Sequence, residues 1–162
     1  MEFTIHDWRG FKEAQQEIVL PAGAAAHIPV TIRYIDEGEA HKGEAHRGTM
    51  LLMHGIPTWG YLYHAIIPPL VEAGYRVLAP DFLGHGWSDR RDRFDRSFQD
   101  QARMIVAFLS ALGLERVDVV GHDTGGAVAL ILAIEHASLV NRLVISNSVC
   151  YDRFDDDMLD FG

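Results

Sequence analysis

Short apolar runs alternate with longer amphipathic segments along most of the chain. Residues 30–35 alternate between apolar and polar side chains, which predicts a strand with one buried face. Four short, mainly apolar runs follow, and runs of this kind predict strands buried on both faces. These runs occupy residues 50–53, 77–80, 117–120 and 143–145. Residues 1–28 carry only a weak pattern, with a turn or loop at 21–26, and the charged, glycine-containing segment 39–48 favours a surface loop.

Three segments of helical length separate the apolar runs. The first covers residues 61–73, and the second extends from an N-cap at Ser97 to a glycine stop at Gly113. The third, residues 125–136, is apolar almost all round, which predicts a helix buried on every side. Strands alternating with helices indicate an α/β fold, with a mostly parallel sheet of about six strands, flanking helices and right-handed crossovers. We expect residues 1–162 to form a single domain.

Composition and charge exclude several classes of protein. Hydrophobic residues make up 48% of the chain and charged residues 23%, as in an ordinary globular protein. The net charge of −9 disfavours a nucleic-acid partner. The first thirty residues lack a signal pattern, no stretch approaches the roughly 20 apolar residues of a membrane span, and the single Cys150 cannot form an internal disulfide. We therefore expect a cytoplasmic protein with no membrane partner.

Neither a metal site nor a cofactor is expected. His41 and His46 have a spacing that could ligate a metal, but no cysteine or carboxylate cage accompanies them. The aspartates at positions 152, 155, 156, 157 and 160 are interpreted as a solvated acidic tail rather than a binding site.

Residues 119–127 carry the strongest chemical signal. An apolar strand ends, a Gly-x-Asp-x-Gly sequence follows, and a helix begins at once. A sharp strand-to-helix turn would raise the side chain of Asp123 above the sheet, and Gly121 and Gly125 lie where a Cβ would come too close. The helix dipole would favour the charged form of Asp123, and an ionised aspartate needs no base to attack an electrophilic carbon. Asp123 is therefore the candidate nucleophile.

Two other interpretations of this motif exist. Aspartate is an ordinary helix N-cap, so a Gly-x-Asp-x-Gly sequence in isolation also fits a structural role. A dinucleotide-binding loop is a second alternative, but the spacing differs from Gly-x-Gly-x-x-Gly and no early strand precedes it.

Two further turn motifs follow the ends of other predicted strands. The first, His54–Pro57, contains Ile56, whose backbone N–H could join that of Thr124 in a cradle for an oxyanion or leaving group. The second covers residues 81–89. Because α/β sheets bind ligands at the carboxyl ends of their strands, we expect the three motifs to meet there. The predicted substrate pocket consists of His54, Pro57, Trp59, His122 and Asn147.

Together these motifs resemble the α/β-hydrolase superfamily. They are HGIPTWGYLY at 54–63, PDFLGHGWSD at 80–89 and GHDTGG at 121–126, and the resemblance covers about residues 30–150. The aspartate at position 123 resembles the haloalkane dehalogenase and epoxide hydrolase branches of the superfamily. The resemblance implies that Asp123 attacks a small hydrophobic epoxide, alkyl halide or ester to form a covalent ester, which a histidine-activated water then hydrolyses.

Several positions depart from these branches. Haloalkane dehalogenases usually carry Asn or Glu where Ile56 stands and Trp where Thr124 stands, and both of those side chains hold the halide. Epoxide hydrolases open the ring with tyrosines of a cap domain, and Tyr61, Tyr63 and Tyr151 are not at those positions. The identity of the substrate therefore stays open.

The partners of the nucleophile are also expected to be missing. The family histidine follows a last strand that should lie beyond residue 162, and none of the nine histidines here is expected to replace it. His122 should point away from Asp123, and Asn147 stands where some dehalogenases carry the acid. We therefore expect the N-terminal portion of the fold, without cap and last strands, and with poor turnover.

An incomplete sheet would expose the apolar run at 143–145 as an edge, which could self-associate or pair with a C-terminal half. A non-catalytic protein that binds a small ligand, and a truncated fragment stable only through self-association, are the alternative functions.

Overall fold

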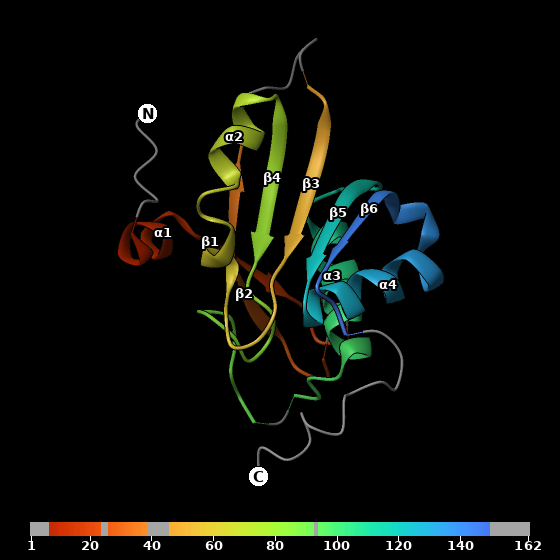
Figure 1. Cartoon of the computed structure of the whole chain (residues 1–162). Helices are drawn as coiled ribbons and strands as arrows, with labels where there is room; N and C mark the ends of the chain where they lie inside the picture. The colour runs from red at the N-terminus through yellow and green to blue at the C-terminus, as the bar shows by residue number, and fades with distance from the viewer. Residues whose placement is uncertain (1–6, 24–25, 39–45, 93, 150–162) are drawn as a thin grey trace, which may run out of the picture.

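A single sheet of six strands forms the centre of the molecule (Figure 1). The computed structural model describes residues 7–23, 26–38, 46–92 and 94–149. The strands are β1 (Gln16–Leu20), β2 (Val30–Glu37), β3 (Gly48–Met53), β4 (Tyr75–Pro80), β5 (Val117–His122) and β6 (Val140–Ser146). They lie in the order β1-β2-β4-β3-β5-β6, with the β4-β3, β3-β5 and β5-β6 pairs parallel and the β1-β2 and β2-β4 pairs antiparallel. The mostly parallel α/β sheet is confirmed.

Helices cover both faces of this sheet. They are α1 (Trp8–Ala14), η2 (Gly60–Tyr63), α2 (Ile67–Glu72), α3 (Phe98–Ala111), α4 (Thr124–Glu135) and η3 (Ala137–Leu139). Side chains of α3 and α4 share one hydrophobic cluster with the sheet, and side chains of α1, η2 and α2 share the other. Among the described residues, no helix is both long enough and apolar enough to cross a membrane.

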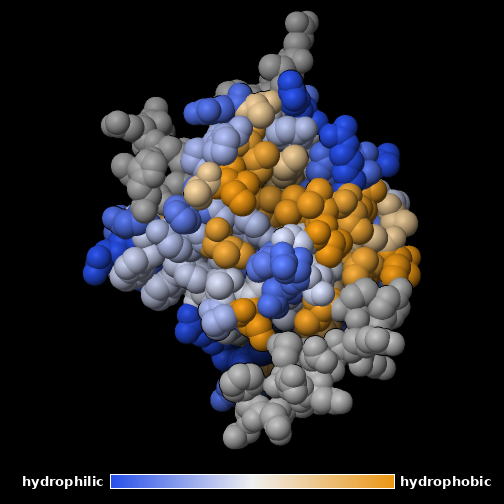
Figure 2. Space-filling view, viewed as in Figure 1, coloured by the Kyte–Doolittle hydropathy of each residue, from blue (hydrophilic) through white to orange (hydrophobic). Residues whose placement is uncertain are grey.

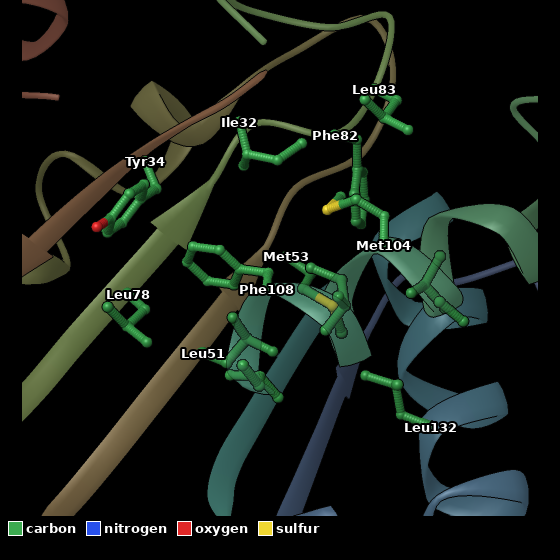
Figure 3. Close-up of a cluster of buried hydrophobic side chains, with 14 of the residues drawn as sticks. Ile32, Tyr34, Leu51, Met53, Leu78, Phe82, Leu83, Met104, Phe108 and Leu132 are labelled. Carbon is green, nitrogen blue, oxygen red and sulfur yellow. The ribbon is translucent and has the colours of Figure 1, made fainter. Parts of the chain in front are cut away.

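Side chains of β3 alternate between the two faces of the sheet, so this one strand contributes to both hydrophobic clusters. Leu51 and Met53 belong to the cluster of α3 and α4, whereas Leu52 belongs to the cluster of α1 and α2. Figure 3 shows Leu51 and Met53 directed toward Phe108 of α3 in the larger cluster. Both faces of β3 are therefore buried, as its continuous apolar run predicts.

The structure corrects the expected helix at 61–73. The chain forms only the short helices η2 and α2 there, with Pro68 and Pro69 in the first turn of α2. A proline lacks the backbone N–H that a continuous helix requires, and its ring clashes with the carbonyl four residues earlier. Two adjacent prolines therefore separate the segment into two helices. By contrast, Ser97 caps α3 as predicted, since its side chain accepts a hydrogen bond from the backbone N–H of Asp100.

The weakly patterned residues 1–28 contain α1, which Asp7 caps, and β1, which pairs with β2. One further expectation needs correction. The helix at 125–136, here α4, is not buried on every side, since Ile134 is 78% exposed. This helix packs on α3 and on strands β5 and β6, so its remaining side stays open.

Strand β6 forms an apolar edge of the sheet. It is the last strand in the order, and every residue after Val140 in this strand is exposed. Leu143, Val144 and Ile145 are among the exposed large hydrophobic residues. Figure 2 shows a broad hydrophobic surface over the region that β6 and α4 occupy in Figure 1. The expected exposed edge is therefore present in the described part of the chain.

Replacing Phe108 by alanine should strongly destabilise the fold. Its fully buried ring lies 4.9 Å from the ring of Tyr34, between α3 and β2. We expect Phe108→Ala to lower the free energy of unfolding by about 3–5 kcal/mol, measured by urea denaturation. Ser110→Ala, at an exposed position of the same helix, is the control. Equal stability of the two variants would contradict the assignment of Phe108 to the core.

Candidate active site

Asp123 lies at the turn between β5 and α4. Its backbone has φ 54° and ψ −123°, a strained conformation for a residue with a side chain. Three hydrogen bonds hold the turn: the Asp123 N–H donates to Ser146 O at 3.2 Å, and the Asp123 carbonyl accepts from Gly126 N–H at 3.0 Å and from Ser148 Oγ at 3.0 Å. The end of β6 therefore supports the strained residue, and Ser148 is a supporting residue that no sequence motif had indicated.

Three glycines allow the backbone to come together around Asp123. A Cβ on Gly121 would lie 2.5 Å from Gly125 O, and one on Gly125 would lie 2.2 Å from Met53 O. A Cβ on Gly55 would lie 2.3 Å from the Cβ of Asp123. These separations are far below van der Waals contact, so no residue other than glycine fits without movement of the backbone. The turn after β3 is thereby packed directly against the turn after β5.

The carboxylate of Asp123 caps its own helix. Its Oδ1 accepts a hydrogen bond from the Thr124 N–H, the first N–H of α4. The positive end of the helix dipole stabilises a negative charge at this place. The Thr124 N–H, expected in the cradle, is therefore already engaged by the carboxylate itself.

A tight turn positions the other expected cradle residue, Ile56. The Gly55 carbonyl accepts hydrogen bonds from the Thr58 N–H at 3.1 Å and from Thr58 Oγ1 at 2.7 Å, and the Ile56–Pro57 peptide bond is cis. The side chain of Ile56 is exposed. Thr58 therefore closes the turn twice, a role that its place in the sequence motif did not reveal.

His54 is buried beneath these turns. Its Nε2 accepts a hydrogen bond from the Phe82 N–H at 3.0 Å, so its Nδ1 carries the hydrogen and donates to Gly55 O at 2.9 Å. Burial lowers the pKa of His54 to about 4. Both ring nitrogens are bonded to backbone, so His54 joins the turns after β3 and β4 rather than presenting a nitrogen to a substrate.

The remaining predicted pocket residues fall into two groups. His122 and Asn147 lie at the ends of β5 and β6, where His122 Nδ1 is 3.1 Å from Ser146 O and Asn147 Oδ1 accepts from Ser146 Oγ at 3.1 Å. Pro57 and Trp59 instead line an open cleft together with Ile56. The structure thus brings His122 and Asn147 to the carboxyl ends of the strands flanking Asp123, and gathers Pro57 and Trp59 in a neighbouring cleft.

A buried carboxylate that was not singled out from the sequence connects these segments. Asp81 Oδ1 accepts from the Gly60 N–H at 2.8 Å, and its Oδ2 accepts from the Trp87 N–H at 2.8 Å and from Gln15 Nε2 at 3.0 Å. Burial raises the pKa of Asp81 above its usual range. A Cβ on Gly86 would lie 2.0 Å from Asp81 Oδ2, which explains the glycine there. The position of Asp81 directly after a strand was its only sequence signal.

No cluster of three or more potential metal ligands occurs in the described ranges. Several residues considered in the sequence lie outside those ranges, namely His41, Cys150, Tyr151 and the aspartates at positions 152, 155, 156, 157 and 160.

Comparison with known proteins identifies the family to which the chain belongs. The family model described as alpha/beta hydrolase fold matches residues 48–160, the segment that carries the strained turn at Asp123. The chain belongs to the α/β-hydrolase family. It is 39% identical over 120 residues to a haloalkane dehalogenase of Mycolicibacterium paratuberculosis, and this match covers 74% of the chain and 38% of the relative.

Solved structures of several hydrolases share the fold. The tetrameric haloalkane dehalogenase DpaA from Paraglaciecola agarilytica has a TM-score of 0.69 at 29% identity, over 83% of this α/β-hydrolase chain and 44% of that one. The epoxide hydrolase CorEH also has a TM-score of 0.69, at 26% identity, over 88% of this chain and 47% of that one. The chain spans about two fifths of the length of the curated relatives that it matches.

The neutral state of His54 predicts a pH-dependent stability. The pKa of about 4 in the folded protein lies below the ordinary histidine value of 6.5, so unfolding takes up a proton between these pH values. The contribution is fully present above pH 6.5 and falls as the pH drops toward 4, by about 3 kcal/mol in total. Urea denaturation across this range measures the loss.

The variant His54→Gln isolates this contribution. We expect it to be less stable at neutral pH but to lose less stability between pH 6.5 and 4 than the original chain. Parallel pH profiles for the two proteins would contradict the neutral, buried His54.

Proposed function

We propose that this α/β-hydrolase chain carries the nucleophile of a hydrolase that acts on small hydrophobic epoxides or alkyl halides, and that Asp123 is this nucleophile. The observation that carries the proposal is the strained turn at Asp123, which holds a carboxylate at the N-terminus of α4. A purely structural N-cap needs no positive φ, and it needs no glycine such as Gly55 packed directly against its Cβ. The names of the similar proteins, which include dehalogenases and an epoxide hydrolase, support the same class of substrate.

In the proposed first step, a carboxylate oxygen of Asp123 attacks the electrophilic carbon. With an alkyl halide, the new C–O bond forms as the carbon–halogen bond breaks, and the halide leaves with the electron pair. With an epoxide, the ring C–O bond breaks and the resulting alkoxide takes a proton from water. Either route gives an ester on Asp123, which water must then hydrolyse to regenerate the carboxylate.

The second step needs a base that activates water. Among the described histidines near Asp123, His54 is buried and bonded through both nitrogens, and His122 is directed to Ser146 O. General-base assistance contributes about 10²–10⁴-fold, so the ester should persist in a chain without it. We therefore propose that this chain performs alkylation but only slow hydrolysis.

Mass spectrometry of the chain after incubation with styrene oxide or 1-bromobutane tests the nucleophile. We expect an adduct of one substrate mass for the epoxide, or of one butyl group for the bromide, located on the peptide that contains Asp123. The variant Asp123→Asn should give no adduct there, and Asp92→Asn, at an exposed carboxylate, should react like the original chain. Equal labelling of Asp123→Asn and the original chain would contradict the proposal, as would many turnovers without an accumulating adduct.

We also propose that the β6 edge associates with a second copy of this chain. An open edge offers unpaired backbone donors and acceptors, and here Leu143, Val144 and Ile145 add exposed apolar side chains. The strand at the opposite edge, β1, is short and contains the charged Glu17. We therefore expect β6 to associate more readily than β1.

Sedimentation velocity of matched lysine variants tests this association. Val144 and Val19 are exposed valines, 54% and 59% accessible, on the two opposite edge strands. We expect the original chain to sediment as a dimer or larger species, Val144→Lys to shift it to monomer, and Val19→Lys to leave it unchanged. A monomeric original chain, or the same effect from both variants, would contradict association through β6.

A further inference from the structure

All three tryptophans of the chain line one open cleft. Trp8 belongs to α1, Trp59 directly precedes η2, and Trp87 lies in the turn after β4. The rings of Trp59 and Trp87 meet edge to face with centroids 6.4 Å apart, while Trp8 and Trp87 are 44% and 42% exposed. The cleft has a volume of about 450 Å³, within the range of roughly 300–1,000 Å³ typical of small-molecule sites. We name it the tryptophan cleft.

Three cationic side chains lie against the rings of Trp8 and Trp87, although the chain as a whole has a net charge of −9. Lys12 Nζ lies 3.6 Å from the centre of the Trp87 ring, and Arg90 Cζ lies 5.9 Å from the same centre. Arg9 Cζ lies 4.6 Å from the centre of the Trp8 ring. Arg90 lines the tryptophan cleft, and Lys12 and Arg9 lie against two of its rings, so the positive charge at this place on an acidic chain favours an anionic ligand.

Arg90 is the cation that lines the cleft directly. It donates one hydrogen bond from Nη2 to Gly86 O, which leaves other N–H groups of the guanidinium for a ligand. Within the described ranges, neither Arg90 nor Lys12 forms a salt bridge with a carboxylate. A guanidinium with free donors beside exposed indole rings matches a carboxylate attached to an aromatic group.

We propose that the tryptophan cleft binds a small aromatic carboxylate, with its ring against the indoles of Trp59 and Trp87 and its carboxylate on Arg90. Asp123 and Thr124 do not line this cleft, but Ile56 of the expected cradle does. The bound anion thus lies beside the cradle segment and needs no contact with the nucleophile. This site goes beyond the proposed hydrolase reaction and does not depend on it.

Tryptophan fluorescence of the whole chain provides a direct measurement, because every tryptophan lies in the cleft. The probes are 4-phenylbutyrate and its uncharged counterpart 4-phenylbutanol. We expect both to change the emission, with the acid binding about tenfold more tightly through its charge-assisted hydrogen bonds to Arg90. Equal affinity for the acid and the alcohol would overturn the proposal.

Variants separate the cleft from other sites. Arg90→Gln should remove the preference for the acid, whereas Arg103→Gln, an exposed arginine of α3, should retain it. Circular dichroism checks that each variant is folded. Asp123→Asn should bind 4-phenylbutyrate like the original chain, so a failure of the proposed nucleophile leaves this result unaffected. Loss of binding in Asp123→Asn, or the same affinity for the acid in Arg90→Gln and Arg103→Gln, would overturn the proposal.

Discussion

Direct contact between backbones, with no side chain between them, is the constraint on which the rest of the site depends. The turn after β3 and the turn after β5 approach until a Cβ on Gly125 would lie 2.2 Å from Met53 O. Because β3 and β5 are parallel neighbours, their carboxyl ends already lie side by side, and the glycines remove the last steric obstacle. The same contact leaves room for the strained conformation of Asp123, because its Cβ faces the backbone of Gly55, which carries no side chain.

Buried polar groups fix the turns around this contact. His54 joins the turns after β3 and β4 through the Phe82 N–H, and Asp81 joins the turn after β4 to Gly60 and to Gln15. Each of these groups satisfies backbone or amide donors that would otherwise be buried without a partner. The positions of these loops are therefore set by side chains beneath the surface of the molecule.

Most of the fold and the centre of the site could be predicted from local signals in the sequence. The apolar runs, the Ser97 cap and the glycines around Asp123 depend on neighbours a few residues away, so they can be recognised one segment at a time. Contacts between distant segments could not be recognised in this way. Asp81 and Gln15 are 66 positions apart, and nothing local pairs them. The break at Pro68 is different, because its signal was local and was outweighed by the apolar spacing around it.

The strand order also determines how this sheet can be assembled. Strand β3 is flanked by β4 and by β5, so one of its two edges remains unpaired until residues 117–122 are available. Pairing between strands so far apart in sequence requires closure of a long loop, which slows folding relative to local hairpins. During synthesis from the N-terminus, one edge of the apolar β3 therefore stays unpaired until β5 has been made, and an unpaired apolar strand edge favours aggregation during this interval.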